Sequence, residues 1–169
     1  MSFERMKEVI EKFEGNFPKV YEDTRGIKTI GVGFNLEQSD ARELFQNALP
    51  MVDFDDVVSG RTSLTNDQVS KLFEAQLKIK IQVAVKLFPK YYDYPSYVQI
   101  ALVNGVFRGE FKASHKTVKL INKEEWSKVA DEYLDRDDYR GSIPGKNGGI
   151  KKRMDYNASQ FRKYAASLK

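Results

Sequence analysis

The chain of 169 residues has no cysteine, no internal repeats or low-complexity segments, and no apolar run that approaches transmembrane length. Its fold therefore does not depend on disulfide bonds, and stable insertion into a membrane is not expected. The N-terminal stretch contains no apolar segment of signal-peptide length, so we expect no export by the general secretory route.

Several catalytic motifs are missing as well. His115 is the only histidine, and no carboxylate stands at ligand spacing from it, so the sequence predicts no metal site and places His115 at the surface. A nucleophile elbow for Ser-His-Asp hydrolysis is absent, and residues 146–152 (KNGGIKK) have the wrong glycine spacing for a phosphate-binding loop. No organic cofactor is implied.

The excess of basic residues is modest. A net charge of +4 and a pI of about 9.1 favour approach to an anionic polymer, and peptidoglycan with its wall polymers is one. Nucleic acid is not the expected partner, because the sequence has no dense basic run and no basic residues interleaved with aromatic ones. The apolar content of 41% suffices for the core of one compact domain or of two small lobes.

Apolar residues at helical spacing after a serine N-cap predict an amphipathic helix over residues 3–13. Glu14 lies four residues after Ile10, at the margin of the apolar stripe, and just before Gly15, a candidate C-cap. Partial burial there would raise the pKa of the carboxyl group by disfavouring its ionised form, as a general acid near neutral pH requires. The alternative is a solvated glutamate at a helix end, which the helix by itself favours.

The segment after this helix is predicted to form a β-hairpin. Pro18 breaks the chain, residues 20–21 form a short strand, residues 23–26 carry turn chemistry, and residues 27–34 alternate as a second strand. One face of the second strand carries Ile27, Thr29, Gly31 and Gly33, and the other carries Lys28, Ile30, Val32 and Phe34. The first face is nearly bare, so a sugar ring or another backbone could approach it closely.

Asp23, at the turn, is expected to stay ionised in a more polar setting than Glu14. Two carboxylates in different environments suit the two roles of glycoside hydrolysis. The alternative is that Asp23 holds its own hairpin as an Asx-turn residue, and the residues alone leave both interpretations open.

Residues 14–33 resemble the signature of a known family. Glu14, eight intervening residues and then D-T-R-G-I-K-T-I-G-V-G from Asp23 resemble the E...D-x-x-G-x-x-T-x-G-x-G pattern of the phage-type lysozymes, glycoside hydrolase family 24, which include the T-even phage lysozyme. Residues 104–111, 116–122 and 124–134 look like the C-terminal helices of that family in the same order.

The resemblance implies that Glu14 is the proton donor, that Asp23 positions or activates the attacking water or acts as the nucleophile, and that Thr29 helps to hold this water. It also implies substrate-side residues, which are Asn35, Phe107, Thr117 and Glu132. Simple core packing is the alternative for Phe107.

Two departures from the family accompany this resemblance. Many relatives carry histidine after the last glycine, and in the T-even enzyme it pairs with an aspartate of the long helix. Here Phe34 and Gln76 occupy these positions, so no ion pair is expected there. The family also pairs its catalytic glutamate with a basic residue near the C-terminus, for which Lys151, Lys152 and Arg153 are the candidates.

The middle of the chain predicts a helix that ends at Pro50, a short helical or irregular segment, and a long helix from about residue 66, where Thr65 and Gln68 form a capping box. Residues 78–88 alternate like a strand, but no turn signal precedes them, and the family has one long helix here. We therefore expect the helix to continue to about residue 88.

The C-terminal part predicts further helices. Residues 97–107 are apolar on nearly all sides and should form a central buried helix. Asn122 with Glu125 should cap a helix that buries Trp126. Residues 135–149 form a polar connector before a last amphipathic helix from Ile150, and the tyrosines 91, 92 and 94 are interpreted mainly as packing and surface anchors.

Together these features predict an α+β, mainly α-helical, lysozyme-like fold of two lobes in a single domain, residues 1–169. The small N-terminal antiparallel sheet belongs to a lobe at about 14–65, the linking helix covers about 66–88, and the C-terminal helical lobe covers about 89–169 with helix 3–13.

The expected activity is that of an endo-acting muramidase, a monomeric bacteriolytic glycosidase that cleaves the β-1,4 bond between N-acetylmuramic acid and N-acetylglucosamine. Inversion is expected if a water fits between the carboxyl groups, whereas a separation of about 5 Å favours a covalent intermediate. A lytic transglycosylase and a catalytically inactive wall-binding module are the alternatives. The expected location is the host cytoplasm before release to the wall, or a virion.

Overall fold

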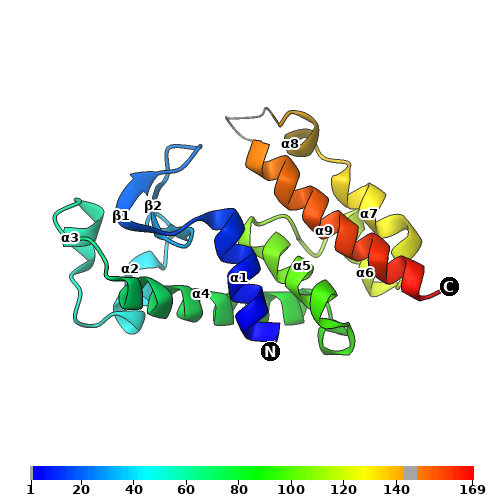
Figure 1. Cartoon of the computed structure of the whole chain (residues 1–169), viewed down its shortest axis with the longest axis horizontal. Helices are drawn as coiled ribbons and strands as arrows, with labels where there is room; N and C mark the ends of the chain where they lie inside the picture. Colours follow the sequence, from blue (N-terminus) through cyan, green and yellow to red (C-terminus); the bar gives the residue numbers. More distant parts are fainter. Residues whose placement is uncertain (1, 143–147) are drawn as a thin grey trace. The chain divides into compact units, whose positions relative to one another are not determined.

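The computed structural model describes residues 2–142 and 148–169. Helices dominate, and a small antiparallel sheet of order β1-β2-β3 lies near the N-terminus, so the predicted α+β, mainly α-helical fold is confirmed (Figure 1). The helices are α1 (Ser2–Glu14), α2 (Ala41–Ala48), α3 (Phe54–Val58), α4 (Asn66–Leu87), α5 (Ser96–Phe107), α6 (Lys116–Asn122), α7 (Trp126–Leu134), α8 (Asp137–Arg140) and α9 (Gly148–Ser167), with a 3-10 turn η1 (Tyr91–Asp93).

The chain divides into two compact units. The N-terminal unit consists of residues 10–79, and the C-terminal unit consists of residues 80–169 together with the start of the chain up to Val9. The boundary falls inside α4, between Ile79 and Lys80. Each unit has its own set of buried apolar side chains, as described below.

The sheet of the N-terminal unit consists of β1 (Phe17–Glu22), β2 (Lys28–Gly31) and β3 (Phe34–Asn35). Tyr21 of β1 pairs with Thr29 of β2, and Ile30 of β2 pairs with Phe34 of β3. The expected chain break at Pro18 is wrong, because Pro18 lies inside β1. This strand is at an edge of the sheet, where a residue without an N–H group is tolerated, and the Pro18 carbonyl accepts a hydrogen bond from the Leu64 N–H at 2.7 Å.

Aromatic side chains organise the core of the N-terminal unit. Phe45 lies between two other rings, with centroid distances of 6.2 Å to Phe34 and 5.5 Å to Phe54, and both pairs meet edge to face. This geometry is favourable for aromatic quadrupoles. The other buried side chains around the sheet and α4 include Ile10, Ile30, Val32, Val57, Val69, Leu72 and Leu77.

The long helix α4 begins where the sequence predicts. The Gln68 N–H donates to Thr65 Oγ1 at 3.1 Å, and Thr65 N–H donates to Gln68 Oε1 at 2.9 Å, which confirms the capping box. The strand-like alternation of residues 78–88 does not produce a strand. Burial follows helical spacing instead, at positions 77, 84 and 88, while the side chains of Ile79 and Val83 are exposed.

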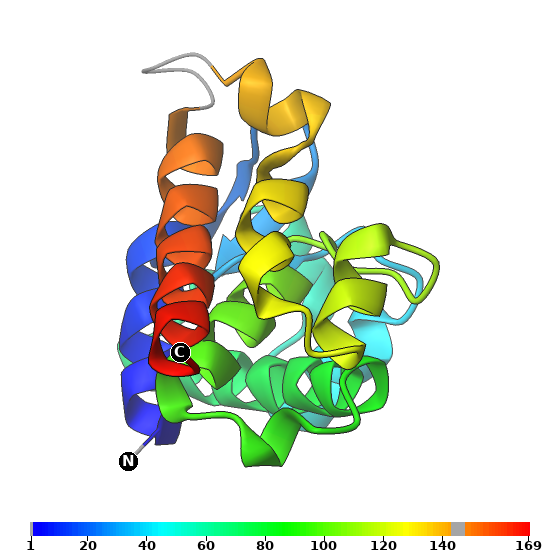
Figure 2. The same cartoon turned by 90° about the vertical axis from the view of Figure 1, so that its right-hand side faces the viewer.

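In the C-terminal unit, α5 is buried along most of its length, as predicted, and contacts α9. Helices α7 and α9 lie side by side (Figures 1 and 2). Trp126, predicted to be in the core, is 3% exposed. Tyr91 and Tyr94 are buried and Tyr92 is exposed, in agreement with packing and surface roles.

Two local predictions in the C-terminal unit need correction. Asn122 does not cap α7, because it is the last residue of α6 and α7 begins only at Trp126; its side-chain N–H donates to the Leu87 carbonyl at 2.9 Å, at the end of α4. Glu125 is the N-cap residue of α7, but its side chain makes no cap hydrogen bond. The predicted connector at 135–149 contains the short helix α8, and residues 143–147 of it lie outside the described part of the chain.

Candidate active site

Glu14 is the last residue of α1 and is half-buried. Its carboxyl group lies against Gly33, since a Cβ atom added to Gly33 would be 2.5 Å from Glu14 Oε2. Gly33 has a φ of +67° and belongs to the turn between β2 and β3, so the prediction of one strand over 27–34 is wrong. A glycine is needed here for both its backbone conformation and the close approach of Glu14.

Asp23 lies at the turn between β1 and β2. Its Oδ1 accepts hydrogen bonds from the N–H groups of Arg25 at 2.8 Å and Ile27 at 3.0 Å, so the Asx-turn interpretation is confirmed. Its other oxygen, Oδ2, is 3.6 Å from Arg25 Nη2, and the side chain is 24% exposed. Oδ1 of Asp23 therefore stabilises the hairpin turn. Oδ2 of the same partly exposed carboxyl group accepts no backbone hydrogen bond of this turn and can interact with other groups.

Thr29 is buried on β2, with 4% of its surface exposed. Its hydroxyl donates to the Ile27 carbonyl at 2.9 Å, which leaves the oxygen lone pairs of the hydroxyl as acceptors. Because Thr29 pairs with Tyr21 across the strands, the threonine and this tyrosine are neighbours in the sheet.

Tyr21 is a half-buried tyrosine of β1 whose phenol is influenced by both carboxylates. Burial raises the pKa of the Tyr21 phenol, and the negative charges of Glu14 and Asp23 raise it further. The sequence predicted Tyr21 only as part of a short strand. Its position two residues before Asp23 could have identified it as a neighbour of the candidate site, because the hairpin register sets it opposite Thr29.

The two departures from the family occupy a packed region beside this site. Phe34 is 1% exposed, and the side-chain N–H of Gln76 donates to the Gly33 carbonyl at 3.3 Å. A neutral hydrogen bond from α4 therefore holds the glycine turn on which the Glu14 carboxyl group rests.

The predicted substrate-side residues fall in different places. Asn35 is in the N-terminal unit, opposite Thr29, and its Oδ1 accepts the Glu37 N–H at 2.7 Å. Phe107, at the end of α5, is half-buried, and Lys80 Nζ lies 5.9 Å from its ring centroid. Thr117 on α6 is buried, whereas Glu132 on α7 is partly exposed with Lys116 Nζ at 3.7 Å.

The candidate basic residues lie on α9 of the C-terminal unit. Lys151 donates to Asp155 Oδ2 at 3.1 Å and to the Tyr139 hydroxyl at 3.0 Å. Arg153 is buried and donates from Nε to Asn104 Oδ1 at 2.8 Å. The pairing of one of these residues with Glu14 stays a prediction.

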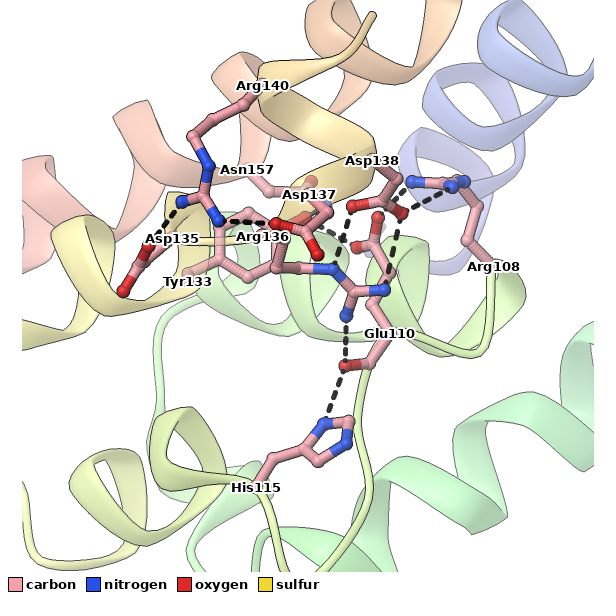
Figure 3. A network of polar contacts seen from close by, with 10 residues as sticks. All are labelled: Arg108, Glu110, His115, Tyr133, Asp135, Arg136, Asp137, Asp138, Arg140 and Asn157. Atoms are coloured by element: carbon pink, nitrogen blue, oxygen red, sulfur yellow. Dashed lines mark hydrogen bonds and ion pairs between the residues drawn. The ribbon is translucent and has the colours of Figure 1, made fainter.

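A buried polar network surrounds Glu110 in the same unit (Figure 3). The Glu110 carboxylate accepts from the Tyr133 hydroxyl at 2.6 Å and from Arg108 at 2.5 Å. Arg136 donates to the Glu110 carbonyl at 3.0 Å, and Arg108 and Arg136 both contact Asp138. His115, predicted to be at the surface, is half-buried, with Nδ1 at 3.2 Å from the Glu110 carbonyl oxygen. This network was not foreseen from the sequence.

Among residues 2–142 and 148–169, no three His, Asp or Glu side chains are grouped so that they could hold a metal ion. None of the helices in this described part is long and apolar enough to span a membrane.

A glutamate at a helix end and an aspartate at a hairpin turn thus lie at the two ends of strand β2 in the N-terminal unit. A family model described as phage lysozyme matches residues 11–155. The chain therefore belongs to the phage lysozyme family, and the resemblance noted at residues 14–33 is confirmed. Membership makes it a peptidoglycan hydrolase of the lysozyme class. None of the curated proteins matches the chain.

Proposed function

We propose that the protein is an endo-acting muramidase that hydrolyses the β-1,4 bond between N-acetylmuramic acid and N-acetylglucosamine. The observation that supports this proposal is geometric: the Glu14 carboxyl group lies against Gly33, at one end of β2, and Asp23 holds the turn at the other end of the same strand. General acid and water-activating carboxylates on a glycosidic bond need this kind of arrangement.

In this mechanism Glu14 donates its proton to the glycosidic oxygen as the bond to the anomeric carbon breaks. A water molecule attacks the developing oxocarbenium ion from the opposite face and gives its proton to Asp23. Because Asp23 Oδ1 is engaged by two backbone N–H groups, we assign the water to Oδ2. The Thr29 hydroxyl donates to Ile27 and can accept a hydrogen bond from the same water.

The released ends of the glycan distinguish this proposal from its alternatives. Purified peptidoglycan treated with the protein should yield N-acetylmuramic acid with free reducing ends, measured by mass spectrometry of the soluble products. Anhydro-sugar ends would instead identify a lytic transglycosylase, in which the sugar's own hydroxyl replaces water. Tight binding to walls without soluble products would identify a binding module.

We further propose that the protein acts as a monomeric phage endolysin, which accumulates in the host cytoplasm and reaches the wall when the membrane is opened. A virion-associated enzyme is the alternative. Immunoblotting of purified phage particles decides between them, because an endolysin is absent from the particle and a virion enzyme is part of it.

Replacing Gly33 with alanine is expected to lower hydrolysis about tenfold or more, because the added Cβ would stand 2.5 Å from Glu14 Oε2 and displace the acid. Gly60→Ala is the matched control. Gly60 also has a positive φ, +82°, so the backbone cost is similar, but its added Cβ would be 3.7 Å from the nearest side-chain atom. Thermal unfolding and wall hydrolysis should be measured for both. Equal specific activities would show that the contact between Gly33 and Glu14 has no role in catalysis.

A further inference from the structure

Phe17 is an exposed aromatic residue on the edge strand β1. The residue is 45% exposed, and the centroid of its ring lies 4.4 Å from that of Tyr21, at an interplanar angle of 47°. Single exposed apolar residues are common on protein surfaces. Here, however, two aromatic rings are in contact on one strand, and only one of the two is largely covered.

The aromatic pair is continuous with the carboxylates. The Phe17 ring packs over Gly15, since a Cβ atom on Gly15 would be 2.6 Å from Phe17 Cε2, and Gly15 directly follows Glu14. Burial raises the pKa of Tyr21, the other member of the pair, and the charges of Glu14 and Asp23 raise it further. The exposed Phe17 ring therefore contacts the residue that follows Glu14, and its aromatic partner Tyr21 lies two residues before Asp23.

A pyranose ring fits such a surface. Its axial C–H groups form an apolar face that packs on an aromatic ring, while its hydroxyl groups remain at the edge for hydrogen bonds. A phenylalanine presents no charge or hydrogen-bonding group of its own, so it would contact a sugar through this face and not through its hydroxyls.

We propose that Phe17 and Tyr21 form a saccharide-binding platform that holds one N-acetyl sugar of the glycan strand beside Glu14 and Asp23. This platform deepens the proposed function and rests on it. Phe17 supplies the exposed face on which the sugar stacks. Tyr21 packs against the Phe17 ring, on the side of Asp23. The occupant is the glycan itself, not the stem peptides of peptidoglycan.

The test uses peptide-free oligosaccharides of alternating N-acetylglucosamine and N-acetylmuramic acid. Their binding is measured by titration calorimetry in the Glu14→Gln background, so that no hydrolysis is needed. Phe17→Ala should weaken binding about tenfold. Phe17→Trp should retain it, because an aromatic face remains. Tyr92→Ala, which removes an exposed ring elsewhere, should bind as the background does, and thermal unfolding of all three should be unchanged.

Equal affinity of Phe17→Ala and the background would overturn the platform but leave hydrolysis by the parent chain untouched. A loss seen only with peptide-bearing peptidoglycan would also overturn it, because the occupant would then be the stem peptide. If the parent chain releases no reducing ends but the Phe17 variants still differ in binding, the proposed hydrolysis is wrong and the platform stands as a glycan-binding site.

Discussion

Glu14→Gln is expected to lower the rate of peptidoglycan hydrolysis by about 10²–10⁴-fold. Glutamine preserves the size of the side chain, but its amide is far too weak an acid to protonate the leaving oxygen. The rest of the site is unchanged, so binding to walls should persist. The measurement is the clearing of purified cell walls together with the release of new reducing ends.

Glu22→Gln is the matched control for this experiment. Glu22 is exposed on β1 next to Asp23, so its replacement makes the same change in net charge close to the site without touching the proposed acid. We expect this variant to clear walls at the parent rate. Unchanged clearing by Glu14→Gln would remove Glu14 from the mechanism.

Glu110→Ala should lower the free energy of unfolding by about 3 kcal/mol or more. The Glu110 side chain is fully buried, and its removal leaves the buried Tyr133 hydroxyl without its acceptor and the partly buried Arg108 guanidinium with Asp138 in place of two carboxylates (Figure 3). Urea unfolding gives the free energy. Asp135→Ala is the control, because Asp135 pairs with Arg140 at the surface and should cost less than about 1 kcal/mol. Equal losses in both variants would contradict a special role for the network.

The same residue predicts a pH dependence. Burial is the largest influence on Glu110 and raises its pKa, while the Tyr133 hydrogen bond and the nearby arginines oppose this. A raised carboxyl pKa means that the folded state holds a proton after the unfolded state has lost it. The contribution of Glu110 to the free energy of unfolding is therefore most favourable below its pKa in the unfolded chain, near 4.5. It declines as the pH rises through its pKa in the folded state.

Urea unfolding of the parent chain and of Glu110→Gln across this range isolates that contribution. The difference in unfolding free energy should shift in favour of the glutamine variant as pH rises, because glutamine carries no charge to desolvate. Because both proteins contain Asp138, its pH-dependent contribution largely cancels in the difference between their unfolding free energies. The pKa of Asp138 is lowered, so its own contribution to stability grows as the pH rises. A difference that does not vary with pH would contradict the raised pKa.

Local signals predicted much of the fold. The capping box at Thr65 and Gln68 and the apolar run of α5 depend on residues close in sequence, and both are found in the structure. Residues 78–88 show where local pattern misleads, since alternate apolar residues also arise when a helix exposes some of them, here Ile79 and Val83. The predicted Asn122 cap is wrong because α6 extends through Asn122 and α7 begins three residues later than the capping pattern predicts, with Glu125 at the N-cap position.

The candidate site was predictable in its residue types and less so in its contacts. Spacing and family resemblance identified Glu14, Asp23 and Thr29. The approach of Glu14 to Gly33 depends on how the end of α1 packs on a turn 19 residues later, and a strand pattern does not reveal such a contact. The hydrogen-bond partners of Glu110 and Tyr133 likewise come from separate helices and loops, so their burial together follows only from tertiary packing.

The central claim is that Glu14 and Asp23 act in one chemical step, and a double-mutant cycle tests it most directly. Reducing-end release from purified peptidoglycan is measured for Glu14→Gln, for Asp23→Asn, which keeps the Oδ1 acceptor of the hairpin, and for the double variant. Residues that act as a unit give non-additive losses. We predict that each single variant releases reducing ends far more slowly than the parent chain. The rate of the double variant should be only slightly below that of the slower single variant. Losses that multiply, or a single variant that retains the parent rate, would contradict a shared step.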